Sequence, residues 1–220
     1  VLANEVMVPL KVLFASDQYQ ENWIEQTEPE NQILGQDSVQ SGVALGSNYL
    51  VFQFQSNQID LATITQVAYD KAYQASLKHG YPHLIRTWNY IHDINGSDDG
   101  LERYQSFCVA RHAMLEKHNQ LSTPNPAATA IGSHNGDNVF VFLFSKISGQ
   151  VIENNRQVSA WEYPKQYAPK QPRFSRAMKQ KDVLMCSGTA SVVGHETKHL
   201  NDVTAQFDEC LKNVSVLLYE

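Results

Sequence analysis

The predicted segments of this 220-residue chain begin one structural plan twice, and that repeat limits the folds open to it. Between residues 50 and 145, the hydrophobic pattern predicts paired strands, a helix, a strand, a second helix and two closing strands. A second pass begins at Phe174, adds a strand at 182–187 and reaches a periodic helix that begins at Asp202. This alternation predicts an α+β fold in which helices pack on one face of a mixed sheet.

The repeat divides the chain into two expected units. The first covers residues 1–147 and includes an N-terminal extension. The second covers residues 148–220, and its first part, 148–172, is expected to be a linker. Because the chain reaches Glu220 in or just after the last helix, we expect this second unit to lack its closing strands.

Turn residues and helix caps set the limits of the expected elements. We expect strands at 8–14, 47–54, 83–94, 127–132 and 139–144, helices at 65–79 and 101–118, and a polar loop or hairpin at 18–40. Thr63 or Thr65 is the expected N-cap of the first helix, and Asn201 or Asp202 that of the last. The last helix carries one apolar stripe, which consists of Val203, Phe207, Leu211, Val214 and Leu218.

Charge and composition exclude several classes of partner. The net charge of −6 argues against nucleic acid, because phosphate binding needs a basic face. No apolar run approaches the roughly 20 residues that span a bilayer, so we expect no membrane partner. Cys108, Cys186 and Cys210 share no C-x-x-C spacing, which suits a reducing compartment. We therefore expect a cytoplasmic protein without a metal or cofactor.

The predicted helix at 101–118 carries an arginine on its apolar stripe. That stripe consists of Leu101, Tyr104, Cys108 and Leu115, and Arg111 lies on it nearly two turns after Tyr104. A guanidinium on a buried face is costly without an anionic partner. Two interpretations remain open: an internal acid or a route to the surface satisfies Arg111, or Arg111 binds the carboxylate of a ligand together with the Tyr104 hydroxyl.

A loop rich in aromatic and arginine residues precedes the second pass. Tyr163 lies in the first half of this loop and Arg176 at its end, within the segment PRFSRA at 172–177. Such a loop could cover a planar anionic ligand, but an ordinary surface loop rich in aromatic residues and proline is the favoured interpretation.

A literal zinc motif, H-E-x-x-H, is present as His195, Glu196 and His199. The motif binds zinc only when a helix places both imidazoles on one face. Gly194 precedes it and the helix signals begin only after it, so a polar loop is the favoured interpretation. A zinc hydrolase is the less favoured alternative.

Several separate motifs carry a resemblance to a known family. They are LMCSGTAS at 184–191, GHET at 194–197, DVTAQ at 202–206, RTWNYIHDIN at 86–95, GLERYQ at 100–105 followed by Phe107, PAAT at 126–129, and PRFSRA at 172–177. In this order they resemble the chorismatase family, which includes 3-hydroxybenzoate synthases and proteins described as pteridine-dependent deoxygenase-like. That family is similar to a tandem of YjgF/RidA-like units, which agrees with the repeated plan.

The resemblance implies chorismate as the substrate and loss of pyruvate, leaving a hydroxybenzoate or a dihydroxycyclohexadiene carboxylate. It also implies substrate binding by Tyr104, Arg111, Tyr163 and Arg176. The family's mechanism begins with protonation by a glutamic acid of the last strand, which we expect beyond Glu220. Glu196 is a weak substitute for that acid.

These implications set expectations for the chain alone. We expect it to release little or no pyruvate without the family's acid, and its uncovered apolar stripe to favour self-association. The alternative function is a non-catalytic RidA-like module that binds a small carboxylate.

Overall fold

The computed structural model describes residues 39–57, 60–98, 100–133 and 136–219. The strand expected at 8–14 and most of the polar stretch at 18–40 lie outside these residues.

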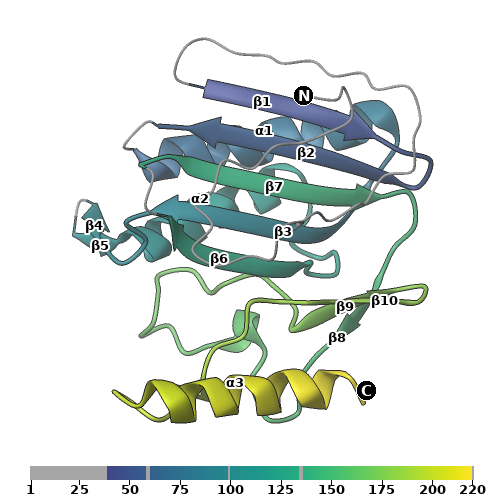
Figure 1. Ribbon diagram of the computed structural model, residues 1–220. Helices are drawn as coiled ribbons and strands as arrows, with labels where there is room; N and C mark the ends of the chain where they lie inside the picture. Colours follow the sequence, from purple (N-terminus) through teal and green to yellow (C-terminus); the bar gives the residue numbers. More distant parts are fainter. Residues whose placement is uncertain (1–38, 58–59, 99, 134–135, 220) are drawn as a thin grey trace, which may run out of the picture.

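A five-stranded mixed sheet forms the larger part of the molecule (Figure 1). Its order is β1 (Val39–Leu45), β2 (Tyr49–Ser56), β7 (Asn138–Ser145), β3 (His83–His92) and β6 (Ala127–Ser133). All neighbours are antiparallel except β3 and β6. Helices α1 (Leu61–His79) and α2 (Arg103–Lys117) pack against each other on one face, as the order of elements predicts. The mixed α+β fold is thus confirmed.

Strand β7 contributes to two hydrophobic clusters, one on each face of the sheet, and all of its residues are buried. Its sequence NVFVFLFS alternates the two faces of the sheet. Phe140, Phe142 and Phe144 contact the helices, whereas Leu143 faces the second region of the chain. A strand covered on both faces reads as a continuous apolar run, which explains the absence of polar alternation.

The limits of three elements differ from the expectation. Helix α1 begins at Leu61, because the Asp60 carboxylate accepts a hydrogen bond from the Thr63 amide at 3.2 Å; neither Thr63 nor Thr65 is the N-cap. Helix α2 begins at Arg103, because Leu101–Glu102 pairs with Ser97–Asp98 as a two-stranded ribbon, β5 with β4. The sheet also begins earlier than residue 50, at β1, an edge strand that contains Gly42.

The second region forms a smaller sheet. Strands β10 (Val183–Cys186), β9 (Ala177–Gln180) and β8 (Gln150–Ile152) pair in that order, and they are all antiparallel. A 3₁₀ turn η1 (Ala160–Glu162), a ribbon of β11 (Val192–Val193) with β12 (Glu196–Thr197), and helix α3 (Val203–Leu217) complete it. Residues 148–172 are therefore not only a linker, since β8 already belongs to the second sheet. The Asp202 N-cap of α3 is confirmed by a 2.9 Å bond from the Ala205 amide.

The second region closes the open edge of the first sheet. The Ser175 amide donates to the Pro126 carbonyl at 2.9 Å, and Ala127 pairs with Ser175 in a parallel bridge. The Gly188 amide donates to the Ala128 carbonyl at 3.0 Å, and the Ala128 amide donates to the Ser187 hydroxyl at 2.8 Å. Strand β6 therefore has partners along both edges at its start.

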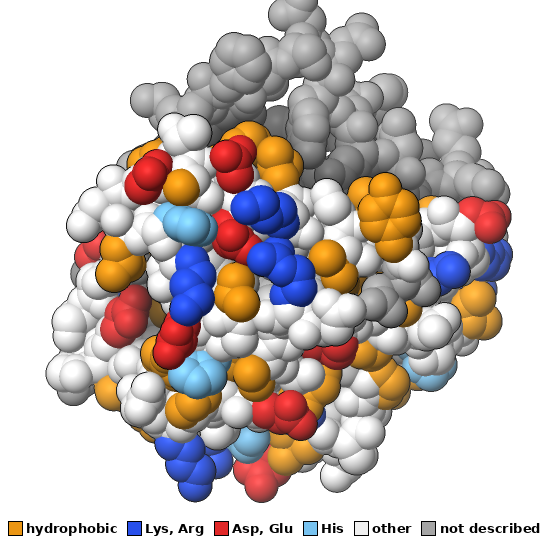
Figure 2. Space-filling model, turned by 90° about the horizontal axis from the view of Figure 1, so that it is seen from below, with side chains coloured by type: hydrophobic (Ala, Val, Ile, Leu, Met, Phe, Trp, Pro, Cys, Tyr) orange, Lys and Arg blue, Asp and Glu red, His pale blue; other side chains and the backbone are white. Residues whose placement is uncertain are grey.

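Helix α3 turns its apolar stripe toward solvent. Phe207 is 61% exposed, and Val203, Leu211 and Leu218 are exposed as well. Figure 2 views the molecule from the α3 side and shows hydrophobic side chains standing between charged ones on this face. No helix among the described residues is both long and apolar enough to cross a bilayer.

Candidate functional site

Helix α2 places the Arg111 guanidinium in the interior, where it is only 3% exposed. The guanidinium lies 5.7 Å from the Tyr69 ring centre and 5.9 Å from that of Phe107, and it donates a hydrogen bond to the Arg173 carbonyl. Among the described residues no acidic oxygen pairs with it, and its Nε has no hydrogen-bond partner. Thus neither an internal acid nor a route to the surface satisfies Arg111 within these residues.

Tyr104 lies nearly two turns before Arg111 on the same helix, and its ring stacks on Phe107 with ring centres 6.1 Å apart. Burial raises the pKa of the Tyr104 hydroxyl well above its ordinary value, with a further increase from Cys108. The nearby Arg111 charge opposes that increase. At neutral pH the hydroxyl is therefore protonated and available as a hydrogen-bond donor.

The second predicted pair also meets in space. One Arg176 nitrogen, Nη2, donates to the Tyr163 hydroxyl at 2.9 Å and to the Val158 carbonyl at 2.8 Å. The guanidinium lies 5.3 Å from the Phe174 ring centre and is 5% exposed as a residue. Arg176 directly precedes β9 and Tyr163 directly follows η1, so the loop and the sheet fix this pair together.

The two pairs form one cluster between α2 and the segment 153–176. Arg111 donates a hydrogen bond to the Arg173 carbonyl, and the Gln105 side chain of α2 donates one to the Tyr167 carbonyl at 2.8 Å, so the segment lies against the helix. The structure thus brings together all four predicted residues. We refer to Tyr104, Arg111, Tyr163, Arg173 and Arg176 as the cationic cluster.

Unpartnered buried polar atoms gather in and around the cationic cluster. They are Nε of Arg111, Arg173 and Arg176, the Ser175 hydroxyl, and Oε2 of Glu153. Buried polar groups normally have a hydrogen-bond partner, so such a concentration points to a ligand site. Burial lowers the pKa of Arg173, and the neighbouring Arg111 charge lowers it further. The cluster therefore holds positive charge that an anion would stabilise.

Two members of this site were not predicted as binding residues. Arg173 has a visible sequence signal, because it lies in the same PRFSRA segment as Arg176. Glu153 has none, since its neighbour Arg176 lies 23 residues further along the chain.

The residues of the zinc motif do not form a helix. Glu196–Thr197 is strand β12, so the two imidazoles do not share a helical face. His195 Nδ1 pairs with the Tyr167 hydroxyl at 2.9 Å, whereas His199 Nε2 pairs with Glu209 at 3.3 Å. Within the described part of the chain, no group of three or more His, Cys, Asp or Glu side chains could hold a metal ion.

Glu196 is poorly suited to donate a proton. Its side chain is 63% exposed and pairs with Lys198 at 2.7 Å. The hydrogen bond from Lys198 lowers the pKa of the Glu196 carboxyl, and the Lys198 charge lowers it further. Such a group is ionised at neutral pH and lies in water, outside the cationic cluster.

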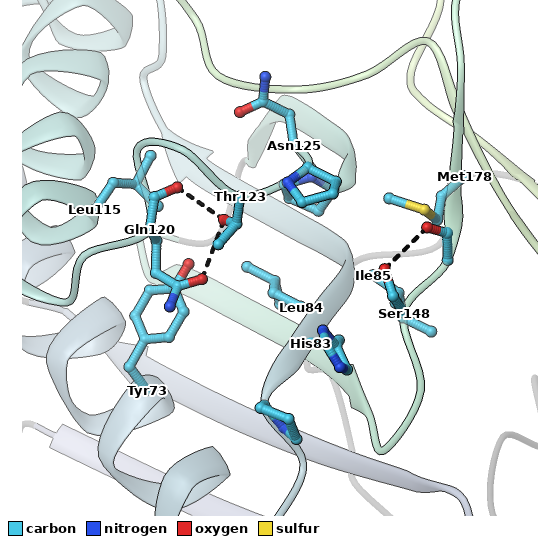
Figure 3. Close-up of a pocket in the computed structure, with 14 residues that line it drawn as sticks. Tyr73, His83, Leu84, Ile85, Leu115, Gln120, Thr123, Asn125, Ser148 and Met178 are labelled. Atoms are coloured by element: carbon cyan, nitrogen blue, oxygen red, sulfur yellow. Dashed lines mark hydrogen bonds between the residues drawn. The ribbon is translucent and has the colours of Figure 1, made fainter.

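A separate cavity of about 290 Å³ opens between the ends of α1 and α2 and the start of β3 (Figure 3). Tyr73, Leu115, Gln120 and Met178 are among the residues that line it. No arginine, lysine or acidic side chain is present in this lining, and none of the cationic cluster contributes to it. It therefore offers no guanidinium or ammonium group to hold a dianion, and His83 is its one basic residue.

Comparison with known proteins gives concordant matches. The family model for the N-terminal part of FkbO/Hyg5-like chorismatases matches residues 21–144. A protein of Streptomyces hygroscopicus named 3-hydroxybenzoate synthase is 39% identical over 164 residues, which is 70% of this chain and 48% of that protein. A chorismatase of Streptomyces rapamycinicus is 41% identical over 144 residues, 62% of this chain and 43% of the relative.

The fold agrees with these matches. A crystal structure of a chorismatase superposes with a TM-score of 0.76 at 34% identity, covering 86% of this chain and 58% of that one. The chain spans about half the length of the curated relatives it matches.

Proposed function

Because the chain belongs to the FkbO/Hyg5-like chorismatase family, we propose that its cationic cluster binds chorismate. Relatives are named chorismatase and 3-hydroxybenzoate synthase, which supports chorismate as the ligand. Chorismate carries two carboxylates, one on its cyclohexadiene ring and one on its enolpyruvyl ether. A site with several guanidinium groups matches this charge, because each fork donates two parallel hydrogen bonds to a carboxylate.

The observation that carries this proposal is the absence of acidic partners for three arginines. Arg111, Arg173 and Arg176 pair with no acid among the described residues, and each keeps an unpartnered Nε. A cluster of buried like charges destabilises the empty protein. A dianionic ligand would reverse that cost, and the hydroxyls of Tyr104 and Tyr163 would supply neutral donors beside it.

Access to the cluster requires movement. The residues Arg111 and Arg176 are 3% and 5% exposed, so a ligand reaches them only when the covering segment 153–176 moves outward. We infer that ligand binding and closure of this segment are coupled.

In the hydrolytic form of the proposed reaction, a carboxylic acid protonates the enolpyruvyl methylene carbon and water adds to the oxocarbenium carbon that results. The hemiketal then breaks its bond to the ring oxygen, which takes up a proton as pyruvate leaves. A positioned acid contributes on the order of 10²–10⁴ in rate, which binding groups cannot replace. We propose that this acid is a residue other than Glu196. For the present chain, ligand binding is therefore the property to measure first.

Replacing Arg111 tests the proposal directly. Arg111→Met keeps the length of the side chain and removes its charge. We expect binding of chorismate or 3-hydroxybenzoate, measured by titration calorimetry, to weaken by about 1.5–3 kcal/mol. The ligand-free variant should melt at the same temperature as the wild type or higher, because an unpaired buried charge is lost.

Arg103 supplies the matched control. It is buried on the same helix but pairs with Asp98 at 2.5 Å and with the His92 carbonyl at 3.0 Å. Arg103→Met should lower stability and leave affinity unchanged. Loss of stability without loss of affinity in Arg111→Met would make Arg111 a structural residue and remove the main support for the proposal.

The non-catalytic carboxylate-binding module remains the second candidate, because the same cluster suits it. Pyruvate release from chorismate, followed with a coupled dehydrogenase assay, separates the two. Binding without pyruvate release in a full-length homologue that shares the cluster would favour the module.

A further inference from the structure

Glu153 and Arg176 are neighbours at the end of the smaller sheet. The register of β8 with β9 ends at Ile152 opposite Ala177, so Glu153 and Arg176 are the next residues on each chain. One carboxylate oxygen of Glu153, Oε1, accepts a hydrogen bond from the Arg176 amide at 3.0 Å. The carboxylate is thus fixed next to the backbone of a cationic-cluster residue.

The other carboxylate oxygen is unsatisfied. Oε2 of Glu153 is buried and has no hydrogen-bond partner of ordinary length and angle, although the Ser159 hydroxyl lies near enough to the carboxylate to favour its ionised form. The Arg176 Nε is buried and without a partner as well. No ion pair forms between the Glu153 carboxylate and the Arg176 guanidinium, although the residues are adjacent. Leaving a buried acceptor and a buried donor without partners costs folding free energy. A ligand with both a donor and an acceptor would recover that cost.

The surroundings make Glu153 a strong acceptor. Burial raises the pKa of its carboxyl, and the Glu162 charge acts in the same direction. The Arg176 amide, the Ser159 hydroxyl and the Arg176 charge favour the ionised form and oppose this increase. A desolvated carboxylate accepts hydrogen bonds strongly and repels a second carboxylate.

Resting on the proposed function, we propose that Glu153 determines specificity by accepting a hydrogen bond from a ring hydroxyl of the bound carboxylic acid. The ligand class is a hydroxylated cyclic carboxylate. Its carboxylate binds the guanidinium groups and its hydroxyl binds Oε2 of Glu153. A ring with a second carboxylate at that position is rejected.

The test compares binding affinities when the ring hydroxyl is absent from the ligand and when the Glu153 carboxylate is absent from the protein. Titration calorimetry of the 220-residue chain compares 3-hydroxybenzoate with benzoate as probes. We expect the wild type to prefer 3-hydroxybenzoate by on the order of tenfold or more. In Glu153→Gln the amide oxygen keeps the bond from the Arg176 amide, so an NH₂ group replaces the free acceptor. The preference should then fall to about twofold or less.

Two further arms sharpen the result. Glu153→Met removes every polar atom at the same length and should also abolish the preference, with thermal melting to verify folding. Isophthalate, which carries a second carboxylate, should bind Glu153→Gln more tightly than the wild type. Glu162→Gln, an exposed neighbour with the same charge change, is the matched control and should keep the wild-type preference.

The outcomes separate this inference from the proposed function. If both probes bind and Glu153→Gln keeps the full preference for 3-hydroxybenzoate, Glu153 does not recognise the hydroxyl. If the wild type binds the two probes equally, the inference also fails. If neither probe nor chorismate binds the wild type, the proposed function fails first, and the role of Glu153 fails with it.

Discussion

Helices α2 and α3 have the same length, 15 residues, and bury opposite kinds of side chain. In α2 the covered face is apolar except for its arginines, among them Arg111. In α3 the covered face consists of Glu209, Asn213 and Leu217, while the apolar stripe faces solvent. An apolar stripe in the sequence therefore identifies the helix face that would gain stability from burial, but it does not show that this face is buried in the fold.

The polar groups of the two helices differ in a second way. Under α3, Arg156 pairs with Glu209 and donates to the Asn213 side chain at 2.7 Å, and Asn213 in turn donates to the Val192 carbonyl at 2.9 Å. Under α2, the Arg111 Nε has no partner. A satisfied network stabilises the fold, whereas unsatisfied buried groups indicate a ligand site.

The largest expected change in stability is at a buried aromatic residue under α1 and α2, compared with an exposed aromatic residue on α3. Phe142 is fully buried and its ring lies 4.8 Å from that of Tyr69. Phe142→Ala should lower the free energy of unfolding by about 3–5 kcal/mol in urea denaturation. Phe207→Ala on α3 is the control and should change it by roughly 0.5 kcal/mol or less. Similar losses at both positions would mean that the α3 stripe is covered in solution.

The next effect concerns the polar network under α3. Asn213→Ala removes the donor to the Ala190 and Val192 carbonyls and the acceptor for Arg156. We expect a loss of about 2–3 kcal/mol, because buried partners are left unpaired. Asp208→Ala on the exposed side of the same helix should stay within roughly 0.5 kcal/mol. A neutral Asn213→Ala would show that α3 is not held by this network.

A smaller, pH-dependent effect tests how α1 and α2 are joined. Asp70 pairs with Lys117 at 2.8 Å and with His118 at 2.7 Å. Burial alone would raise the pKa of Asp70, but these hydrogen bonds lower it overall from 3.8. Because the pKa of Asp70 is lower in the folded protein than in the unfolded chain, its ionised carboxylate stabilises the fold at every pH above the ordinary pKa. This stabilisation is lost as the pH falls through the lowered pKa of the folded protein.

Asp70→Asn should therefore cost about 0.2–1 kcal/mol at neutral pH and nothing in strong acid. Thermal melting between pH 2 and pH 7 measures the difference. An equal cost at both ends of this range would rule out the ionic contribution.

The smallest effect is expected at Glu196. Because its carboxylate is exposed and its ion pair is with the exposed Lys198, Glu196→Gln should leave both chorismate affinity and the melting temperature unchanged. A large drop in pyruvate release after this single change would restore Glu196 as the proton donor.

The sequence predicted those features that depend on neighbours close in the chain. The helix that follows Asp202, strands β2, β3, β6 and β7 of the first sheet, and the pairing of α1 with α2 follow from periodicity and element order. Asp60 was missed as a cap because Thr63 and Thr65 are equally good capping residues, and β1 was missed because Gly42 weakens its pattern. The exposure of the apolar stripe of α3 could not be predicted, since burial of a helix face depends on which other elements pack against it.

The candidate site was predicted in part. Helical spacing brought Tyr104 and Arg111 together, and the family resemblance added Tyr163 and Arg176. Their contact across the two regions depends on tertiary structure, and so does the position of Glu153. Their roles in binding remain predictions.

The hydrogen bonds between β6 and the second region can form only after the second region has been synthesised. On the outer edge of β6, the partners of Ala128 come later than Ser175, and the first of them, Ser187, lies 59 residues after Ala128 in the chain. At roughly 5–20 residues per second, a ribosome needs about 3–12 s to make that interval. During this delay the growing chain carries an open strand edge, the feature that invites pairing with a foreign strand. Synthesis rate and chaperone supply, and not only final stability, therefore decide how much of this protein folds correctly.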